Sequence, residues 1–344
     1  MDIQEYQQDM KELQGQIIYF IDNEDSSEYD YEKIIEYLEN QEFLEENDLL
    51  YSILKFINSI SKHHHRTTDF FKKIEHIIMF FKEQIKQTLS NQKLFHIFKK
   101  NKRMLLLLFE NGLLIKDEEI KNILSKESNF FNYLFDKSDD NEIEDKKKKG
   151  ENDQYICQLI REDNIDEFVI HTNQVNLSLE KITIRPSLFE TNPLLMKTKP
   201  TLIEYAAFFG SMNIIKYLCY NRVIMMQSLW IFAIHSNNHE LIHFLEEKRL
   251  LPFNGSFEKI LKESIKCNHD EIADYIRSKY FNQDEENDFI IKKSLKYYNY
   301  TFYPKKIDDN QILYYLSQYD NYDAVRILVE TTDLDPNAKI ILKK

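Results

Sequence analysis

Apolar residues recur at helical intervals through the first part of the chain. Between residues 31 and 60, Ile34 and Leu38 are four residues apart, as are Ile53 and Ile57, with polar residues between them. This spacing places apolar side chains on one face of a helix. The same rhythm continues to about residue 135, with short polar breaks. The pattern therefore predicts a helical array over residues 1–135, which could consist of degenerate repeats.

A strongly charged segment follows this array. Residues 136–154 read DKSDDNEIEDKKKKGENDQ, in which Ile143 is an isolated apolar residue. Such a composition cannot supply a buried face, so we expect a solvated linker or loop. The run Lys146 to Lys149 would suit a phosphate contact or a nuclear address, but the surrounding Asp and Glu residues offset its charge.

Residues 155–344 contain an internal repeat. The segments TLIEYAAFFGSMNIIKYL (201–218) and SLWIFAIHSNNHELIHFL (228–245) align with a constant offset of 27 residues. A third copy spans 260–276 and a fourth spans 312–329. Each copy reads as two short helices joined by a polar turn, and helices of this length must stack on their neighbours to bury their apolar faces.

The alignment also predicts which side chains are buried between the stacked copies. Equivalent positions of the first helix are Ala206, Ala233 and Ser264, and equivalent positions of the second helix are Leu218, Leu245 and Ile276. We expect both sets to lie in the packed interior.

The first copy resembles the ankyrin repeat, in which a threonine start precedes paired alanines, a glycine turn and an aliphatic second helix. The matching positions are Thr201, Ile203, Ala206, Ala207, Gly210, Ile214, Ile215, Lys216 and Leu218. DLDPNA (333–338) resembles the ankyrin turn, and residues 187–211 resemble a divergent ankyrin-like subfamily of unassigned function that is expanded in parasitic protists. The resemblance implies an all-α, ankyrin-like helical-repeat solenoid preceded by the N-terminal helical array.

This resemblance also implies a non-enzymatic scaffold or adaptor that binds a protein or peptide on its concave face. On that face, Phe208 and Phe209 of one copy would lie beside His235 and Ser236 of the next. The two phenylalanines could equally pack against the neighbouring copy, because large aromatic side chains are seldom left fully exposed.

The segment HELIH (239–243) matches the zinc metalloprotease signature H-E-x-x-H, and that activity is the alternative function. His239 and His243 would bind zinc with Glu240 as the base, and Glu258 or Glu263 could add a ligand from another helix. However, the glycine and histidine that continue one class of this signature are missing. The repeat instead places both histidines at variable surface positions, so we assign no catalytic or metal-binding residue.

Three successive histidines, His63, His64 and His65, form a second possible metal site. Adjacent helical positions point about 100° apart, so the three side chains could converge on one ion only if the segment were irregular. A polar turn between helices is the favoured interpretation, and adventitious metal binding is the alternative.

Composition and charge exclude several classes of function. The chain has five glycines and no G-x-G-x-x-G or phosphate-binding loop, so we expect no nucleotide cofactor. It has 45 basic and 58 acidic residues, a net charge of −13 that would repel nucleic acid.

The cysteines and the apolar runs bear on the compartment. Cys157, Cys219 and Cys267 are odd in number and far apart, so we expect buried, reduced thiols. No apolar run approaches the ~20 residues that span a bilayer, and the N-terminal residues do not resemble a secretory signal. We therefore expect a cytoplasmic protein without a membrane span.

Overall fold

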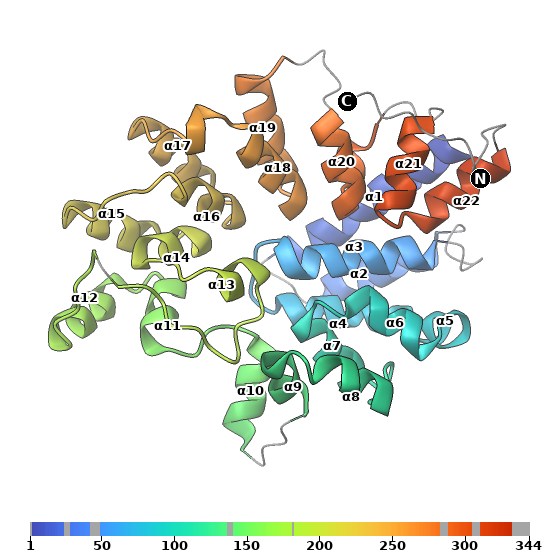
Figure 1. Cartoon of the computed structure of the whole chain (residues 1–344), viewed down its shortest axis with the longest axis horizontal. Helices are drawn as coiled ribbons and strands as arrows, with labels where there is room; N and C mark the ends of the chain where they lie inside the picture. Colours follow the sequence, from blue (N-terminus) through green and yellow to red (C-terminus); the bar gives the residue numbers. More distant parts are fainter. Residues whose placement is uncertain are drawn as a thin grey trace. The chain divides into compact units, whose positions relative to one another are not determined.

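The structure is a computed structural model that describes residues 2–23, 28–41, 49–135, 140–180, 182–282, 288–304 and 310–331. Within these ranges the regular elements are helices, accompanied by an isolated antiparallel bridge between Thr183 and Thr201. The all-α class predicted from the sequence is therefore confirmed (Figure 1). The chain forms two compact units.

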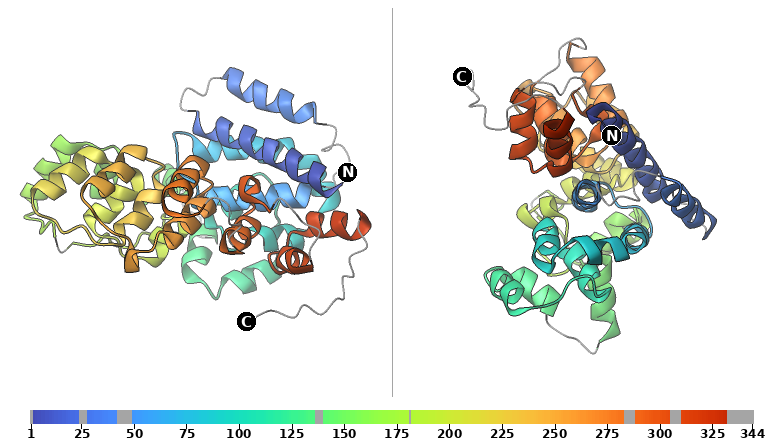
Figure 2. Two further views of the ribbon diagram at one scale, coloured as in Figure 1. Left: turned by 90° about the horizontal axis from the view of Figure 1, so that it is seen from above. Right: turned by 90° about the vertical axis from the view of Figure 1, so that its right-hand side faces the viewer.

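Unit 1 comprises Met1–Ser61, Arg66–Ile97 and Asn282–Lys344. Its described helices are α1 (Ile3–Asp22), α2 (Glu28–Glu39), α3 (Leu50–His63, whose last two residues belong to unit 2), α4 (Phe70–Phe80), α5 (Lys82–Thr88), α6 (Asn91–Phe98, whose last residue belongs to unit 2), α20 (Asp288–Tyr297), the 3-10 helix η3 (Tyr300–Phe302), α21 (Asn310–Gln318) and α22 (Tyr322–Thr331). A capping box between Asp2 and Glu5 starts α1, which lies beside α2 (Figure 2).

Polar contacts inside unit 1 join helices from opposite ends of the sequence. The hydroxyl of Tyr6 on α1 is 3.1 Å from Ser52 Oγ on α3 and 3.3 Å from the hydroxyl of Tyr300 on η3. The backbone N–H of Ser52 donates to the carboxylate of Asp323 on α22 at 2.9 Å. The C-terminal helices therefore belong to the same unit as the N-terminal array, and the predicted division of the chain around residues 136–154 does not match these units.

Unit 2 comprises Lys62–His65 and Phe98–Phe281. Its described helices are α7 (Lys102–Glu110), α8 (Glu118–Leu124), α9 (Ser128–Phe135), α10 (Asn141–Lys149), α11 (Tyr155–Arg161), α12 (Ile165–Gln174), α13 (Pro193–Lys197), α14 (Leu202–Phe209), α15 (Met212–Tyr220), α16 (Leu229–His235), α17 (His239–Glu247), the 3-10 helix η2 (Phe253–Gly255), α18 (Glu258–Cys267) and α19 (Asp270–Tyr280).

Helix α10 occupies residues 141–149 of the segment predicted to be a linker or loop, so the loop interpretation is wrong for these residues. The side chain of Asp140 caps its N-terminus, and Gly150 ends it with a φ of 66°. Lys146 pairs with Glu142 at 2.7 Å, and Lys147 pairs with Glu144 at 2.9 Å. Charge pairs at these intervals, with acidic residues in the first turn and lysines in the last, stabilise a helix that has almost no apolar face.

Four helix pairs of unit 2 follow one another in chain order: α11–α12, α14–α15, α16–α17 and α18–α19 (Figure 1). The first helix of each pair packs against the first helix of the next, because α14 contacts α11 and α16, and α16 contacts α18. The six equivalent positions identified by the repeat alignment are fully buried, as predicted: Ala206, Ala233, Ser264, Leu218, Leu245 and Ile276.

The neighbouring first helices run parallel. Near the start of α14, the carboxylate of Glu204 accepts a hydrogen bond of 2.5 Å from Ser228 Oγ, just before α16. Near the other end, the rings of Phe208 and His235 stack 5.1 Å apart. Similarly, Trp230 at the start of α16 contacts Phe257, just before α18, with ring centroids 5.3 Å apart. The N-terminal ends of α14, α16 and α18 thus share one side of unit 2.

A left-handed residue forms the turn within each of these pairs. Its φ is 47° at Asp163, 69° at Gly210, 53° at Asn237 and 56° at Asn268. Asn and Asp are, after glycine, the residues that adopt this conformation most readily. The four turns therefore share one geometry although glycine occurs in only one of them.

The structure bears on two further predictions, those for the cysteines and for membrane spans. All three cysteines are free, with Cys157 and Cys267 buried and Cys219 half-buried. Among the described helices, none is both long and apolar enough to cross a membrane. The segment 333–338, which resembles the ankyrin turn, lies outside the described residues.

Asp163→Ala tests the link between successive helix pairs. The carboxylate of Asp163 accepts hydrogen bonds from the backbone N–H groups of Asn213 (2.9 Å) and Ile214 (3.0 Å) in the first turn of α15. We expect a loss of about 1–3 kcal/mol in the free energy of unfolding, from the lost cap and the left-handed strain. Urea denaturation measures it. Asp163→Asn keeps a hydrogen-bond acceptor, and asparagine tolerates a positive φ, so this variant should lose less than half as much free energy of unfolding. Equal losses for the two variants would contradict the capping role of Asp163.

Ala206→Arg tests the packing between helix pairs. Ala206 is fully buried on α14, so we expect the unpaired charge to cost about 3 kcal/mol or more and to lower the melting temperature sharply. Tyr220→Arg is the control, because that side chain is 87% exposed and its replacement should change stability by less than about 0.5 kcal/mol. A melting temperature unchanged by Ala206→Arg would contradict the register.

Candidate functional site

The structure brings together the four residues predicted to contact a partner, at the C-terminal ends of α14 and α16. Phe208 and His235 stack with their ring planes 22° apart, so the two copies do meet there. Both of these side chains are buried, whereas Phe209 and Ser236 are partly exposed. Of the two interpretations for the phenylalanines, packing applies to Phe208. Contact between Phe209 or Ser236 and a partner stays a prediction.

The H-E-x-x-H segment lies on the exposed side of α17. His239 Nε2 is 3.6 Å from a carboxylate oxygen of Glu271, whereas His243 Nδ1 is 3.4 Å from a carboxylate oxygen of Glu246. Among the described residues, neither histidine belongs to a group of side chains that could hold a metal ion.

The acidic ligands suggested for this motif are engaged elsewhere. Glu258 pairs with Lys262, and Glu263 pairs with His235 and Lys266. Among the described residues, no third ligand therefore converges with His239 and His243, as the zinc protease hypothesis requires.

Two equivalent loops carry exposed apolar side chains that the sequence did not single out. These are Ile224 and Met226 between α15 and α16, and Leu251 and Phe253 between α17 and α18. Each is between 59% and 70% exposed. Ile224 aligns with Leu251, and Met226 with Phe253, by the same offset of 27 residues. We refer to these four residues as the loop patch.

Both loops begin with the same backbone geometry. Arg222 follows α15 with a φ of 62°, and Arg249 follows α17 with a φ of 54°. The next N–H donates to a carbonyl in the last turn of the helix, from Val223 to Leu218 and from Leu250 to Leu245, each at 3.0 Å. These contacts form the Schellman ending of a helix, which sets the chain direction beyond it. The loop patch is therefore held at matching positions.

The two loops emerge on the side of unit 2 that holds the N-terminal ends of α14, α16 and α18. Trp230 at the start of α16 is fully buried and donates its indole N–H to the carbonyl of Leu250 at 2.8 Å. This bond fixes the second loop to α16. The exposed basic residues Arg222, Lys248 and Arg249 border the loop patch, in a chain whose net charge is negative.

An open hollow of about 340 Å³ lies next to the loop that follows α12. Its walls include Tyr155 on α11, His171 on α12 and the loop residues Val175 and Ile182. The same loop continues to Thr183, which bridges to Thr201 at the start of α14. The hollow therefore lies on the same side of unit 2 as the loop patch.

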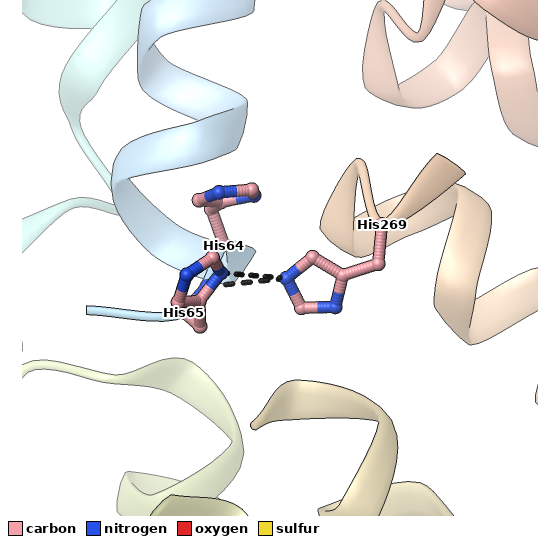
Figure 3. A group of neighbouring side chains, drawn as sticks. All are labelled: His64, His65 and His269. Carbon is pink, nitrogen blue, oxygen red and sulfur yellow. Dashed lines mark hydrogen bonds between the residues drawn. The ribbon is translucent and has the colours of Figure 1, made fainter. Parts of the chain in front are cut away.

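Buried polar groups gather at the opposite, C-terminal ends of α16 and α18. His64, His65 and His269, which we call the histidine cluster, each place a ring nitrogen within 4.8 Å of the others (Figure 3). His64 and His269 are buried, and His65 is half-buried. Burial, aided by the neighbouring imidazoles of His64 and His65, holds the pKa of His269 well below 6.5, so that its ring is neutral at pH 7.

A second buried group consists of His235, Glu263 and Cys267. Burial lowers the pKa of His235 despite the adjacent carboxylate, so the neutral ring donates its Nε2–H to Glu263 at 2.8 Å. Burial acts to raise the pKa of Glu263, but the hydrogen bond from His235 and the charge of Lys266 outweigh it and bring the pKa to about 2. Burial raises the pKa of the Cys267 thiol, which therefore stays protonated.

Glu263→Gln tests the electrostatic role of this group. The pKa of about 2 in the folded chain lies below the ordinary glutamate pKa of 4.5, so ionised Glu263 stabilises the fold above about pH 4.5, and this stability is lost as pH falls toward 2. We expect Glu263→Gln to cost about 1–3 kcal/mol at pH 7 and progressively less as the pH is lowered. Urea denaturation at several pH values measures this. Glu258→Gln, at a half-buried position on the same helix, is the control. An effect of Glu263→Gln that does not change with pH would contradict the assignment.

Comparison with known proteins adds no assignment to this geometry: no family model matches the sequence, and no curated protein or solved structure matches it significantly.

Proposed function

We propose that this chain is a divergent ankyrin-like helical-repeat protein that acts without catalysis, by binding an extended segment of another protein. The consecutive helix pairs, the burial of equivalent positions and the recurrent left-handed turns support a repeat architecture. The resemblance of residues 201–218 to the ankyrin repeat agrees with this architecture.

The loop patch is the observation that supports this function most directly. Solitary exposed apolar residues are ordinary, but large ones at matching positions of consecutive loops form a patch that a partner can cover. Loops held by a rigid scaffold commonly carry binding residues, and a few large side chains supply most of the affinity of an interface. We therefore propose that the partner contacts mainly these two loops, rather than the C-terminal ends of α14 and α16.

The charges around the loop patch favour an acidic partner segment. Within the described part of the chain, neither Arg222 nor Arg249 forms an ion pair, and both are exposed. Carboxylates flanking the apolar side chains of the partner would complement these guanidinium groups. The hollow beside Tyr155 and Val175 extends the same side of unit 2 and would hold a further side chain of an extended segment.

A cytoplasmic location agrees with this proposal. The three free cysteines, two of them buried, suit a reducing compartment. We infer no cofactor for the binding function, because apolar contact and charge complementarity suffice for it.

Selection from a random peptide library against the full chain tests the proposed function. We expect the recovered peptides to combine large apolar residues with Asp or Glu. Ile224→Asp and Phe253→Asp should each weaken binding of such a peptide at least about tenfold, or ~1.4 kcal/mol, measured by fluorescence anisotropy. Arg222→Glu should also weaken binding, and added salt should reduce the difference from the unmodified protein.

Ile115→Asp is the matched control for Ile224→Asp. The two isoleucines are 69% and 70% exposed, so both substitutions place a carboxylate on the surface, but Ile115 follows α7 and lies outside the loop patch. Peptide affinity should be unchanged by Ile115→Asp. Equal affinities for the Ile224→Asp and Ile115→Asp proteins, or no enrichment of peptides at all, would overturn the proposal.

A further inference from the structure

The histidine cluster has the composition and spacing of a transition-metal site. His65 Nδ1 and His269 Nε2 are 3.2 Å apart, close to the roughly 3.3 Å that separates two nitrogens bound to one tetrahedral zinc ion. The ligand atoms of all three side chains lie within 4.8 Å of one another (Figure 3). His269 Nε2 accepts hydrogen bonds from the backbone N–H of His65 at 3.4 Å and from His65 Nδ1 at 3.2 Å, so a bound ion would take the place of both.

Backbone carbonyls orient two of the three rings. His64 Nδ1 is 2.8 Å from the carbonyl oxygen of Cys267, and His269 Nδ1 is 2.7 Å from that of Ile234. Each carbonyl requires a proton on Nδ1, so the lone pair of the neutral ring is on Nε2. A hydrogen bond from the distal ring nitrogen to a carbonyl is the usual way in which proteins fix a metal-binding histidine.

The backbone at His64 and His65 removes the geometric objection that applies to adjacent helical residues. Helix α3 ends at His63, and the two histidines lie in the irregular segment that follows it. Asn192, which caps α13, donates to the carbonyl of Lys62 at 3.2 Å, and this bond anchors the segment within unit 2. The side chains of His64 and His65 are therefore not held about 100° apart, as those of adjacent helical residues are.

We propose that His64 Nε2, His65 Nδ1 and His269 Nε2 bind one Zn²⁺ ion, with water as the fourth ligand. Neutral imidazoles suit zinc and related transition metals, whereas Mg²⁺ and Ca²⁺ prefer oxygen ligands. The ion would fasten the segment 62–65 to the turn between α18 and α19, both in unit 2. This proposal is independent of partner binding, since the loop patch lies at the other ends of these helices.

The neighbouring group of His235, Glu263 and Cys267 suits a metal less well. Glu263 already accepts hydrogen bonds from His235 at 2.8 Å and from Lys266 at 2.6 Å, and the ammonium of Lys266 would repel a cation. The thiol of Cys267 would have to lose its proton in a buried setting that disfavours the thiolate. The histidine cluster is therefore the more suitable metal site of the two.

Metal titration of the full chain after treatment with a chelator tests the site. We expect about one Zn²⁺ per chain at micromolar metal, measured by calorimetry and by elemental analysis after dialysis. Co²⁺ should give the visible absorption of a four- or five-coordinate ion and should be displaced by Zn²⁺. Zinc should also raise the melting temperature, because it binds the folded chain only.

Two substitutions locate the ligands. His65→Ala, at a half-buried position outside any helix, should weaken zinc binding at least about tenfold and abolish the rise in melting temperature, with an unchanged circular dichroism spectrum. His269→Gln should do the same where it folds. The double variant His239→Ala/His243→Ala removes the exposed histidines of α17 and should bind zinc like the unmodified protein, as should Cys267→Ser.

Three results would each overturn the proposal. The first is that the unmodified protein binds no stoichiometric zinc. The second is that His65→Ala binds zinc as tightly as the unmodified protein. The third is that the His239→Ala/His243→Ala variant or Cys267→Ser loses the metal, which would assign it to the H-E-x-x-H helix or to the neighbouring group.

Discussion

Each helix in the row from α11 to α19 is too short to be stable alone, and this constraint underlies the arrangement of unit 2. The eight paired helices have between 7 and 11 residues, below the length at which an isolated helix persists in water. Their apolar faces are buried only when one pair packs on the next. The small side chains of Ala206, Ala233 and Ser264 are fully buried along this row, where a larger side chain would separate the neighbouring helices.

The turn within each pair makes this packing repeatable. A left-handed residue reverses the chain over a few positions, and Asp163, Gly210, Asn237 and Asn268 all supply it. Asp163 adds a second role, since its carboxylate caps the helix of the next pair. This turn geometry therefore does not require glycine, because short polar side chains tolerate positive φ.

The parallel helices have exposed apolar loops at one end and buried polar side chains at the other. At the N-terminal ends, the loops are fixed by buried contacts such as that of Trp230, while their apolar side chains remain in solvent. At the C-terminal ends, His235, Cys267 and His269 are buried among polar partners. A partner segment at the first end and a zinc ion at the second would therefore act on the same helices without competing for the same residues.

The sequence by itself determined the helical class, the copies in 201–276 and the burial of their equivalent positions, because local periodicity encodes which face of a helix is apolar. The repeat offset of 27 residues also contained the signal for the loop patch, since it aligns Ile224 with Leu251. Only the tertiary structure decided the rest. Charge pairs and caps made a helix of the segment from Asn141 to Lys149, which its hydrophobicity could not predict. Long-range packing joined the C-terminal helices to α1, and it brought His269 to within hydrogen-bonding distance of His65 across 204 positions of sequence. Such contacts depend on how helices pack in three dimensions, and no local pattern in the sequence records them.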